Sequence, residues 1–230
     1  MKARMRAVVA LVLGLGVAAA ADAPRNPIVP GWYADPEIRR FGERYWIYPT
    51  LSVAPEGIPA PKLSERQRAM RATPKLRPAY LTQTWMDAFS SKDLKTWTKH
   101  PRVLSVEGVS WAAYAMWAPS AIRANGRYYL FFGANDVHPG EVGGIGVAVA
   151  DRPQGPFRDL LGKPLIGTVE NGAQPIDQMA FQGADGQWYL YYGGWGHLNV
   201  VRLVPDMRRL LPHADGTVFK EITPPGYVEG

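Results

Sequence analysis

The chain lacks several features that identify common classes of protein. It contains no cysteine, so no disulfide stabilises it and its fold depends on a hydrophobic core. Its four histidines show no spacing typical of a zinc site, and we predict neither a metal site nor a cofactor. It also has no Gly-x-Ser-x-Gly motif, which removes the common signal of an esterase nucleophile.

The chain also lacks a strongly basic surface, although its net charge is +6. Lys2, Arg4 and Arg6 supply three of these positive charges, and residues 51–80 supply a net four. The remaining residues sum to about neutral. We therefore predict no nucleic-acid partner.

No apolar run in the chain is long enough to span a membrane comfortably. The first 21 residues instead combine three basic side chains, an apolar stretch over residues 7–16 and a run of small residues over 17–21. This pattern predicts a signal peptide at residues 1–21, a secreted or periplasmic protein, and no membrane contact after cleavage. Residues 22–230 remain as one domain.

An aromatic pattern recurs three times along the domain. Each copy has a glycine turn, one or two polar residues and an aromatic-rich strand, and the copies occupy residues 41–48, 125–132 and 185–192. This is the pattern of a β-hairpin. Residues 51–80 separate the first copy from the second and are rich in charge and proline, so we expect a long surface loop or a partly disordered flap, with a short helix around residues 63–71.

A short strand precedes each hairpin, at residues 35–38, 119–122 and 177–181. Units of about four strands that repeat every 60 residues or so are typical of a β-propeller. The sequence therefore predicts an all-β fold of about three blades, with the start of a fourth near residue 229. Unpaired edges of the end blades favour self-association.

Three acidic residues occupy equivalent places in this repeat. Asp35 and Asp177 each begin an innermost strand, and Glu229 falls where a fourth innermost strand begins. Because innermost strands line the propeller axis, we expect the three carboxylates to converge, as glycoside cleavage requires. The alternative for each acid is a local role in capping backbone N–H groups at a strand entry.

Five segments resemble, in order, the motifs of glycoside hydrolase family 43. They are residues 31–37 (GWYADPE), 117–122 (WAPSAI), 144–151 (GIGVAVAD), 174–177 (QPID) and 227–230 (YVEG). The resemblance implies a five-bladed β-propeller and an inverting glycosidase. It further implies that Asp35 is the general base, that Asp177 tunes the pKa of the acid and orients it, and that Glu229 is the general acid.

The resemblance implies a carbohydrate substrate, namely an arabinoside or xyloside of plant-type polysaccharides or oligosaccharides. The sequence departs from the family's pattern after Glu229, where a fourth and a fifth blade would follow. Two alternatives therefore stay open. One is an inactive fragment or sugar-binding remnant of such an enzyme. The other is a related five-bladed glycosidase or glycoside phosphorylase.

Five further residues are candidates for contact with a sugar. Aromatic rings stack on the apolar faces of sugars, and Trp32, Trp111 and Trp195 lie in or beside loops that lead to or from innermost strands. His197 lies at the end of such a loop. The resemblance adds Trp117, because it implies that the Trp-Ala-Pro stretch shapes the sugar subsite beside Asp177. Packing between blades is the alternative for Trp32, Trp111 and Trp195. For His197 the alternative is a structural hydrogen bond.

Overall fold

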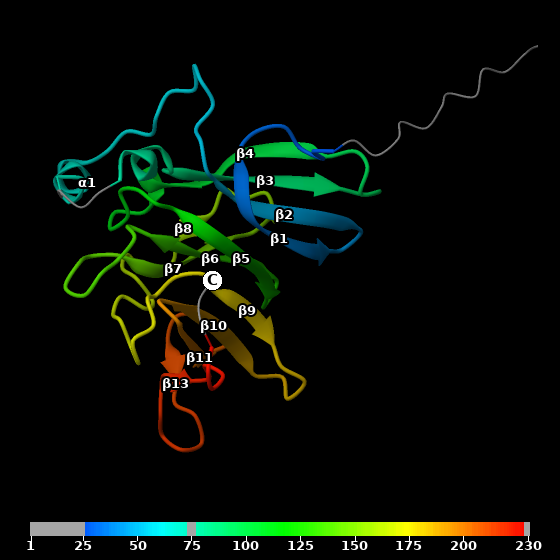
Figure 1. Cartoon of the computed structure of the whole chain (residues 1–230). Coiled ribbons are helices and arrows are strands. Elements are labelled where there is room, and N and C mark those ends of the chain that lie inside the picture. The colour runs from blue at the N-terminus through cyan, green and yellow to red at the C-terminus, as the bar shows by residue number, and fades with distance from the viewer. Residues whose placement is uncertain (1–25, 73–76, 228–230) are drawn as a thin grey trace, which may run out of the picture.

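The computed structural model describes residues 26–72 and 77–227. The predicted signal peptide and Glu229 lie outside these residues. Strands form three antiparallel sheets that follow one another along the chain (Figure 1). The predicted hairpins are confirmed, because each aromatic segment forms a strand paired with the innermost strand before it.

Sheet 1 has the order β1-β2-β3-β4 and sheet 2 the order β5-β6-β7-β8. The strands of sheet 1 are β1 (Tyr33–Phe41), β2 (Arg44–Leu51), β3 (Trp85–Ser91) and β4 (Thr98–Ser105). Those of sheet 2 are β5 (Trp117–Ala124), β6 (Arg127–Ala134), β7 (Gly144–Ala150) and β8 (Arg158–Asp159).

Sheet 3 has the order β9-β10-β11-β12, with β13 also paired to β11. Its strands are β9 (Met179–Gln182), β10 (Trp188–Gly194), β11 (His197–Leu203), β12 (Leu210–Leu211) and β13 (Lys220–Glu221). The innermost strands β1, β5 and β9 are neighbours in space, since β5 contacts both of the others. This arrangement brings the starts of three distant segments to one place.

Sheet 2 is buried on both faces. Alternate side chains of β6 point to opposite faces, so Leu130 and Phe132 pack in a core shared with sheet 1, while Tyr129 and Phe131 pack in a core shared with sheet 3. This explains why β6 is aromatic and apolar without alternation. Burying each of these side chains contributes about 1.5–3 kcal/mol.

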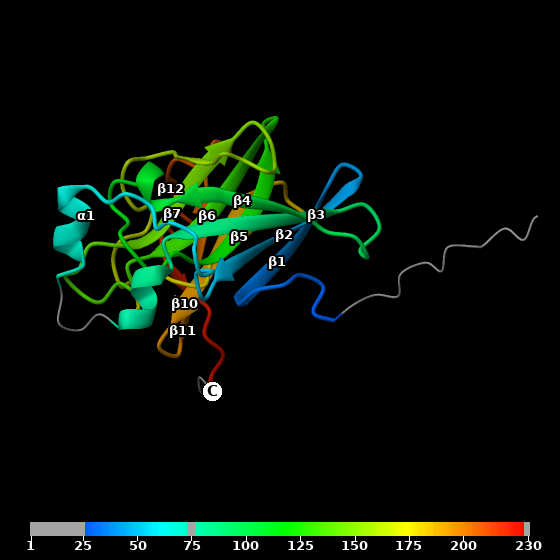
Figure 2. The ribbon, with the colours of Figure 1, turned by 90° about the horizontal axis from the view of Figure 1, so that it is seen from above.

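The charged segment between β2 and β3 is mostly irregular and exposed over its described residues, and it contains two short helices. It forms α1 (Glu65–Met70), close to the predicted helix, and the short 3-10 helix η1 (Pro78–Thr82). Ser64 and Gln67 form a capping box at the start of α1. The described part of the segment is therefore a surface loop that carries a docked helix, and α1 lies at the end of the molecule opposite the β1–β2 turn (Figures 1 and 2).

The buried side chain of Gln67 holds α1 against the chain between β4 and β5. Its amide nitrogen donates to the carbonyls of Val106, Val109 and Ala112, at 2.7, 3.1 and 2.8 Å. Val106 lies in η2 (Val106–Gly108), which leads from β4 toward β5. The segment thus stabilises the chain that connects sheets 1 and 2. Within the described residues, no helix has the length and apolar character needed to cross a membrane.

Candidate active site

Asp35 and Asp177 line one cavity, as the repeat predicted. We call this cavity of about 270 Å³ the axial cavity, because the starts of β1, β5 and β9 form its wall. Its lining residues are Asp35, Pro36, Glu37, Ala118, Pro119, Asp177, Gln178 and Met179. Both carboxylates are solvent-exposed, so water has access to them.

Three equivalent positions of the repeat share an uncommon backbone conformation. Asp35, Ala118 and Asp177 have φ angles of +47°, +42° and +54°, in the left-handed region. In β1 and β5 this residue lies at a register irregularity typical of a β-bulge, which re-aims side chains. Aspartate tolerates this conformation better than most residues, so the backbone itself favours Asp35 and Asp177 at the start of an inner strand.

Hydrogen bonds between the sheets hold these strand starts together. The Ala118 N–H donates to Thr50 Oγ1 of β2 at 2.7 Å, and the Gln178 side-chain amide donates to the Ala118 carbonyl. Gly193 N–H donates to the Ile176 carbonyl at 3.0 Å, which ties the residue before Asp177 to β10. The strand starts at Ala118 and Asp177 are therefore fixed by neighbouring strands.

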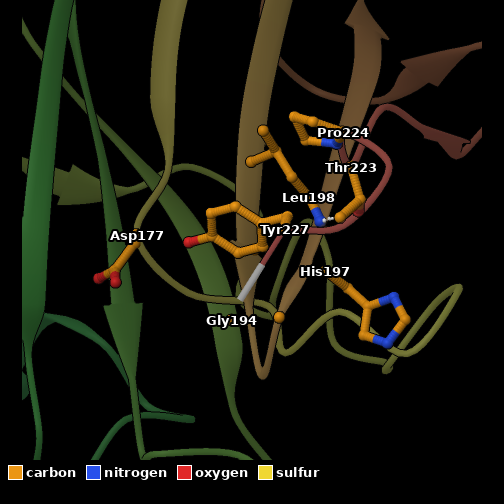
Figure 3. Close-up of a pocket in the computed structure, with 9 residues that line it drawn as sticks. Asp177, Gly194, His197, Leu198, Thr223, Pro224 and Tyr227 are labelled. Atoms are coloured by element: carbon orange, nitrogen blue, oxygen red, sulfur yellow. Dashed lines mark hydrogen bonds between the residues drawn. The ribbon is translucent and has the colours of Figure 1, made fainter. Parts of the chain in front are cut away.

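A second cavity, also of about 270 Å³, adjoins the axial cavity at Asp177. We call it the side cavity. Its lining residues are Asp177, Gly193, Gly194, Gly196, His197, Leu198, Thr223, Pro224 and Tyr227. In Figure 3 the hydroxyl end of Tyr227 points to the side of Asp177, and the ring of His197 points away from Asp177.

Polar contacts fix the far wall of the side cavity. His197 Nδ1 lies 2.8 Å from Glu221 Oε1, and the Thr223 hydroxyl donates to the same oxygen at 3.0 Å. These two hydrogen bonds, His197 first, lower the pKa of Glu221. The Leu198 N–H donates to Thr223 Oγ1 at 2.9 Å, the dashed bond in Figure 3. His197 is thus both a structural partner of Glu221 and a residue of the cavity wall.

The structure corrects the prediction for Trp111. This side chain is only 1% exposed and stacks on Phe132, with ring centroids 5.6 Å apart. Its indole N–H donates to Asp159 Oδ2 at 2.9 Å. No face of the ring is open to a sugar, so Trp111 is a core residue between sheets 1 and 2.

The other three predicted tryptophans lie outside the two cavity walls. Trp32 is 72% exposed, and Trp195 is 41% exposed beside the ring of His138. Trp117 is half-buried, donates its indole N–H to Gln83, and meets the Tyr80 ring edge-on at 4.6 Å. Their contact with a sugar remains a prediction.

Several residues of the site were not found from the sequence. Four residues line the cavities but were not predicted as catalytic or sugar-binding residues: Glu37, Gln178, Thr223 and Tyr227. A signal existed for Glu37, because it is two residues beyond Asp35 on the same strand. Among the residues that the structure describes, no group of three or more histidine, aspartate and glutamate side chains is arranged to hold a metal ion.

The sequence matches the family "Glycosyl hydrolases family 43" over residues 24–230. A β-D-galactofuranosidase of Aspergillus niger is 42% identical over 217 residues, which are 89% of this chain and 54% of that protein. A xylosidase/arabinosidase of Bacteroides ovatus is 32% identical over 171 residues, 74% of this chain and 46% of that protein.

Solved structures agree with the sequence comparison. An α-L-arabinofuranosidase of Clostridium thermocellum superposes with a TM-score of 0.61 at 29% identity, covering 84% of this chain and 56% of that one. The chain belongs to glycosyl hydrolase family 43, and its sheets are blades of that family's β-propeller. It spans about half the length of the relatives that it matches.

Proposed function

We propose that this protein hydrolyses O-glycosidic bonds of arabinosides or xylosides with inversion at the anomeric carbon. The observation that carries the proposal is the meeting of Asp35 and Asp177 at one solvent-accessible cavity, although they are 142 positions apart. Family membership supports the reaction, and the names of the relatives support pentose substrates.

In the proposed reaction Asp35 is the general base. Its carboxylate takes a proton from a water molecule in the axial cavity, and the water oxygen forms a bond to the anomeric carbon. The bond to the leaving oxygen breaks as Glu229 donates a proton to that oxygen. Separate carboxyl groups suit this single displacement, because the water must fit between the base and the sugar. Asp177 orients Glu229 and raises its pKa, since a nearby negative charge disfavours ionisation.

A sugar ring bound in the side cavity lies beside Asp177. Gly193 and Gly194 leave the cavity floor without side chains, and Tyr227 supplies an aromatic wall and a hydroxyl group. A flat floor with an aromatic wall suits the apolar face of a furanose or pyranose ring. We therefore propose the side cavity as the sugar subsite.

The test is hydrolysis of three 4-nitrophenyl glycosides by the purified chain: the α-L-arabinofuranoside, the β-D-xyloside and the β-D-galactofuranoside. The third is included because a 42% identical relative bears the name galactofuranosidase. We expect Asp35→Asn to lower kcat by a factor of about 100 or more, because a general base contributes about 10²–10⁴-fold. Glu43→Gln, at the exposed turn of the same sheet, is the matched control.

Near-normal turnover by Asp35→Asn would contradict the assignment of the base. NMR detection of the first-formed anomer decides the stereochemistry, and a retained configuration would contradict inversion.

Sugar binding without turnover is a second candidate function. The observation that supports this candidate is the lining of the side cavity, whose residues lie between 177 and 227 and do not include Glu229. Calorimetric titration with xylose and arabinose oligosaccharides separates the two candidates: binding with no hydrolysis of any of the three glycosides supports the second.

We also propose that the protein is exported and that its signal peptide is removed near residues 20–22. N-terminal sequencing of the mature chain tests this proposal.

A further inference from the structure

The backbone of Ala180 in β9 is held by side chains of the other two sheets. Its N–H donates to Ser120 Oγ of β5 at 2.9 Å, and its carbonyl accepts from Arg39 Nη2 of β1 at 2.8 Å. Ala180 lies at the inner edge of sheet 3, where, within residues 26–72 and 77–227, no further strand of that sheet pairs with β9. Backbone groups at a buried strand edge require partners, and here both come from outside the sheet.

Glu37 joins the two side chains that hold Ala180. Its carboxylate accepts from Ser120 Oγ at 3.0 Å, from the N–H of Ala121 and from the guanidinium of Arg39. The Glu37 side chain is only 17% exposed. Burial raises the pKa of Glu37, while Arg39, the Ala121 N–H and Ser120 favour its charged form. One buried carboxylate thus connects sheets 1, 2 and 3.

The network starts at the wall of the axial cavity, which Glu37 lines, and extends a few residues beyond the other lining positions. Glu37 follows Asp35 by two residues, Ser120 follows Ala118 by two, and Ala180 follows Asp177 by three. A displacement of Ala180 relative to β1 therefore changes the separation of the two aspartates.

We propose that Glu37, Arg39 and Ser120, here called the axial clasp, are positioning residues that set the separation of Asp35 and Asp177. The inference rests on the proposed function, because it assigns these residues a part in the same site. The inference gives a physical cause for the separation of the two aspartates. Backbone hydrogen bonds pair strands within each sheet, and between the sheets charged and hydroxyl side chains take their place. Catalytic groups must be held within about 0.5 Å, and a misplacement of about 1 Å can cost about 100-fold in rate.

The first test compares Arg39→Met with Arg40→Met by NMR of the whole chain. Arg40 is the next residue of β1, is exposed, and lies over the ring of Tyr45 at 5.9 Å, so its loss changes charge equally without touching the clasp. Arg39 bonds the Ala180 carbonyl, while the exchanging N–H stays bonded to Ser120 Oγ, so the expected effect is indirect. The loss of the Arg39 hydrogen bond makes local opening of β9 easier, and we expect Arg39→Met to increase amide proton exchange at Ala180 by about 10-fold. We also expect it to shift the amide resonances of Asp35 and Asp177.

The second test is kinetic. Arg39→Met should lower kcat by about 10- to 100-fold and leave KM within about 2-fold, because the side cavity that binds the sugar is intact. The double variant Glu37→Gln/Arg39→Met should cost no more than the more damaging single variant, since the residues act as one unit.

The outcome for the axial clasp can be distinguished from the outcome for the proposed function. If the unsubstituted chain hydrolyses no glycoside, the proposed function fails, and the exchange rate of Ala180 and the aspartate resonances still decide the clasp. The clasp is overturned if Arg39→Met leaves those signals unchanged, if Arg40→Met changes them equally, or if the effects of Glu37→Gln and Arg39→Met on kcat are additive.

Discussion

Asp35 and Asp177 share a left-handed backbone conformation, with φ angles of +47° and +54°, and line the same cavity from two different sheets. Ala118 of the intervening sheet has the same conformation, with φ +42°, and lines the same cavity without a functional group. The repeat therefore supplies one backbone position per sheet at the axis, and the side chain there is free to differ.

The first prediction uses Ala118, whose conformation is unfavourable for alanine. The left-handed region costs an L-residue about 1–2 kcal/mol, and glycine avoids this cost at a loss of about 0.4–1 kcal/mol in unfolded-state entropy. We expect Ala118→Gly to leave the free energy of unfolding unchanged or to raise it by up to about 1 kcal/mol. Urea denaturation measures the change.

Ala121→Gly, three residues later in β5, is the matched control. Ala121 is buried, and its backbone is not in the left-handed region. Glycine there should therefore lower the free energy of unfolding by roughly 1–2 kcal/mol. Equal losses at both positions would contradict strain at Ala118.

Local patterns accounted for the sheets but not for the segment between β2 and β3. The hairpins were predictable because a glycine turn and aromatic strand are local signals. The docking of α1 was not, because the carbonyls that accept from Gln67 lie 39 to 45 residues further along the chain. Composition showed only charge and proline, which are also typical of a flap.

The candidate site was predictable where the repeat carried the information. Asp35 and Asp177 were found because their positions recur, and Glu229 was placed in the same way but lies outside the described residues. Trp111 was misassigned because nearness to an inner strand does not reveal burial, which depends on Phe132 and Asp159. Glu37 was missed because two of its partners, Ser120 and the Ala121 N–H, belong to another sheet.

The second prediction concerns the close approach of Gly146 to Trp111. A Cβ atom at Gly146 would lie 2.4 Å from Trp111 Cζ2 and 2.6 Å from Phe132 Cζ. Gly146→Ala should lower the free energy of unfolding by about 1–3 kcal/mol, because the buried rings must shift. The control is Gly133→Ala in β6, where the nearest atom, the Trp117 carbonyl oxygen, is 3.7 Å away. Equal urea midpoints for the two variants would contradict the packing argument.

The third prediction concerns the buried carboxylate of Asp87 in β3, whose side chain is 1% exposed. It accepts from the Tyr33 hydroxyl and the Arg102 N–H, both at 2.8 Å, and pairs with Lys99 at 2.9 Å. Asp87→Ala should lower the free energy of unfolding by about 1–3 kcal/mol, because it leaves the Tyr33 hydroxyl and the Arg102 N–H without their acceptor, while the Lys99 ammonium is 43% exposed and regains water.

A surface ion pair provides the comparison for Asp87. Asp151 is 85% exposed and pairs with Arg127 at 3.2 Å. Exposed pairs contribute about 0–1 kcal/mol, so Asp151→Ala should change the urea midpoint little. A loss at Asp87 no larger than the loss at Asp151 would show that the buried network contributes no more than a solvated pair.

The fourth prediction is a pH dependence that arises at Asp93, in the turn after β3. Its Oδ1 accepts from the N–H groups of Thr96 and Lys95 at 2.8 and 2.9 Å, and from the Ser91 hydroxyl at 3.0 Å. These hydrogen bonds, Thr96 first, lower the pKa of Asp93 from 3.8 to about 2. A lowered folded-state pKa stabilises the fold above the unfolded-state value, and this stability is lost as the pH falls toward the folded-state value.

Asp93→Asn keeps a carbonyl acceptor of similar shape and removes the charge. We therefore expect this variant to be less stable than the parent at pH 6, and the difference in urea midpoint to narrow below pH 3.8 and to become small by pH 2. Measurement of both proteins at intervals between pH 6 and pH 2 follows this change. A difference that stays constant over the whole range would mean that the turn depends on the shape of the side chain and not on its charge.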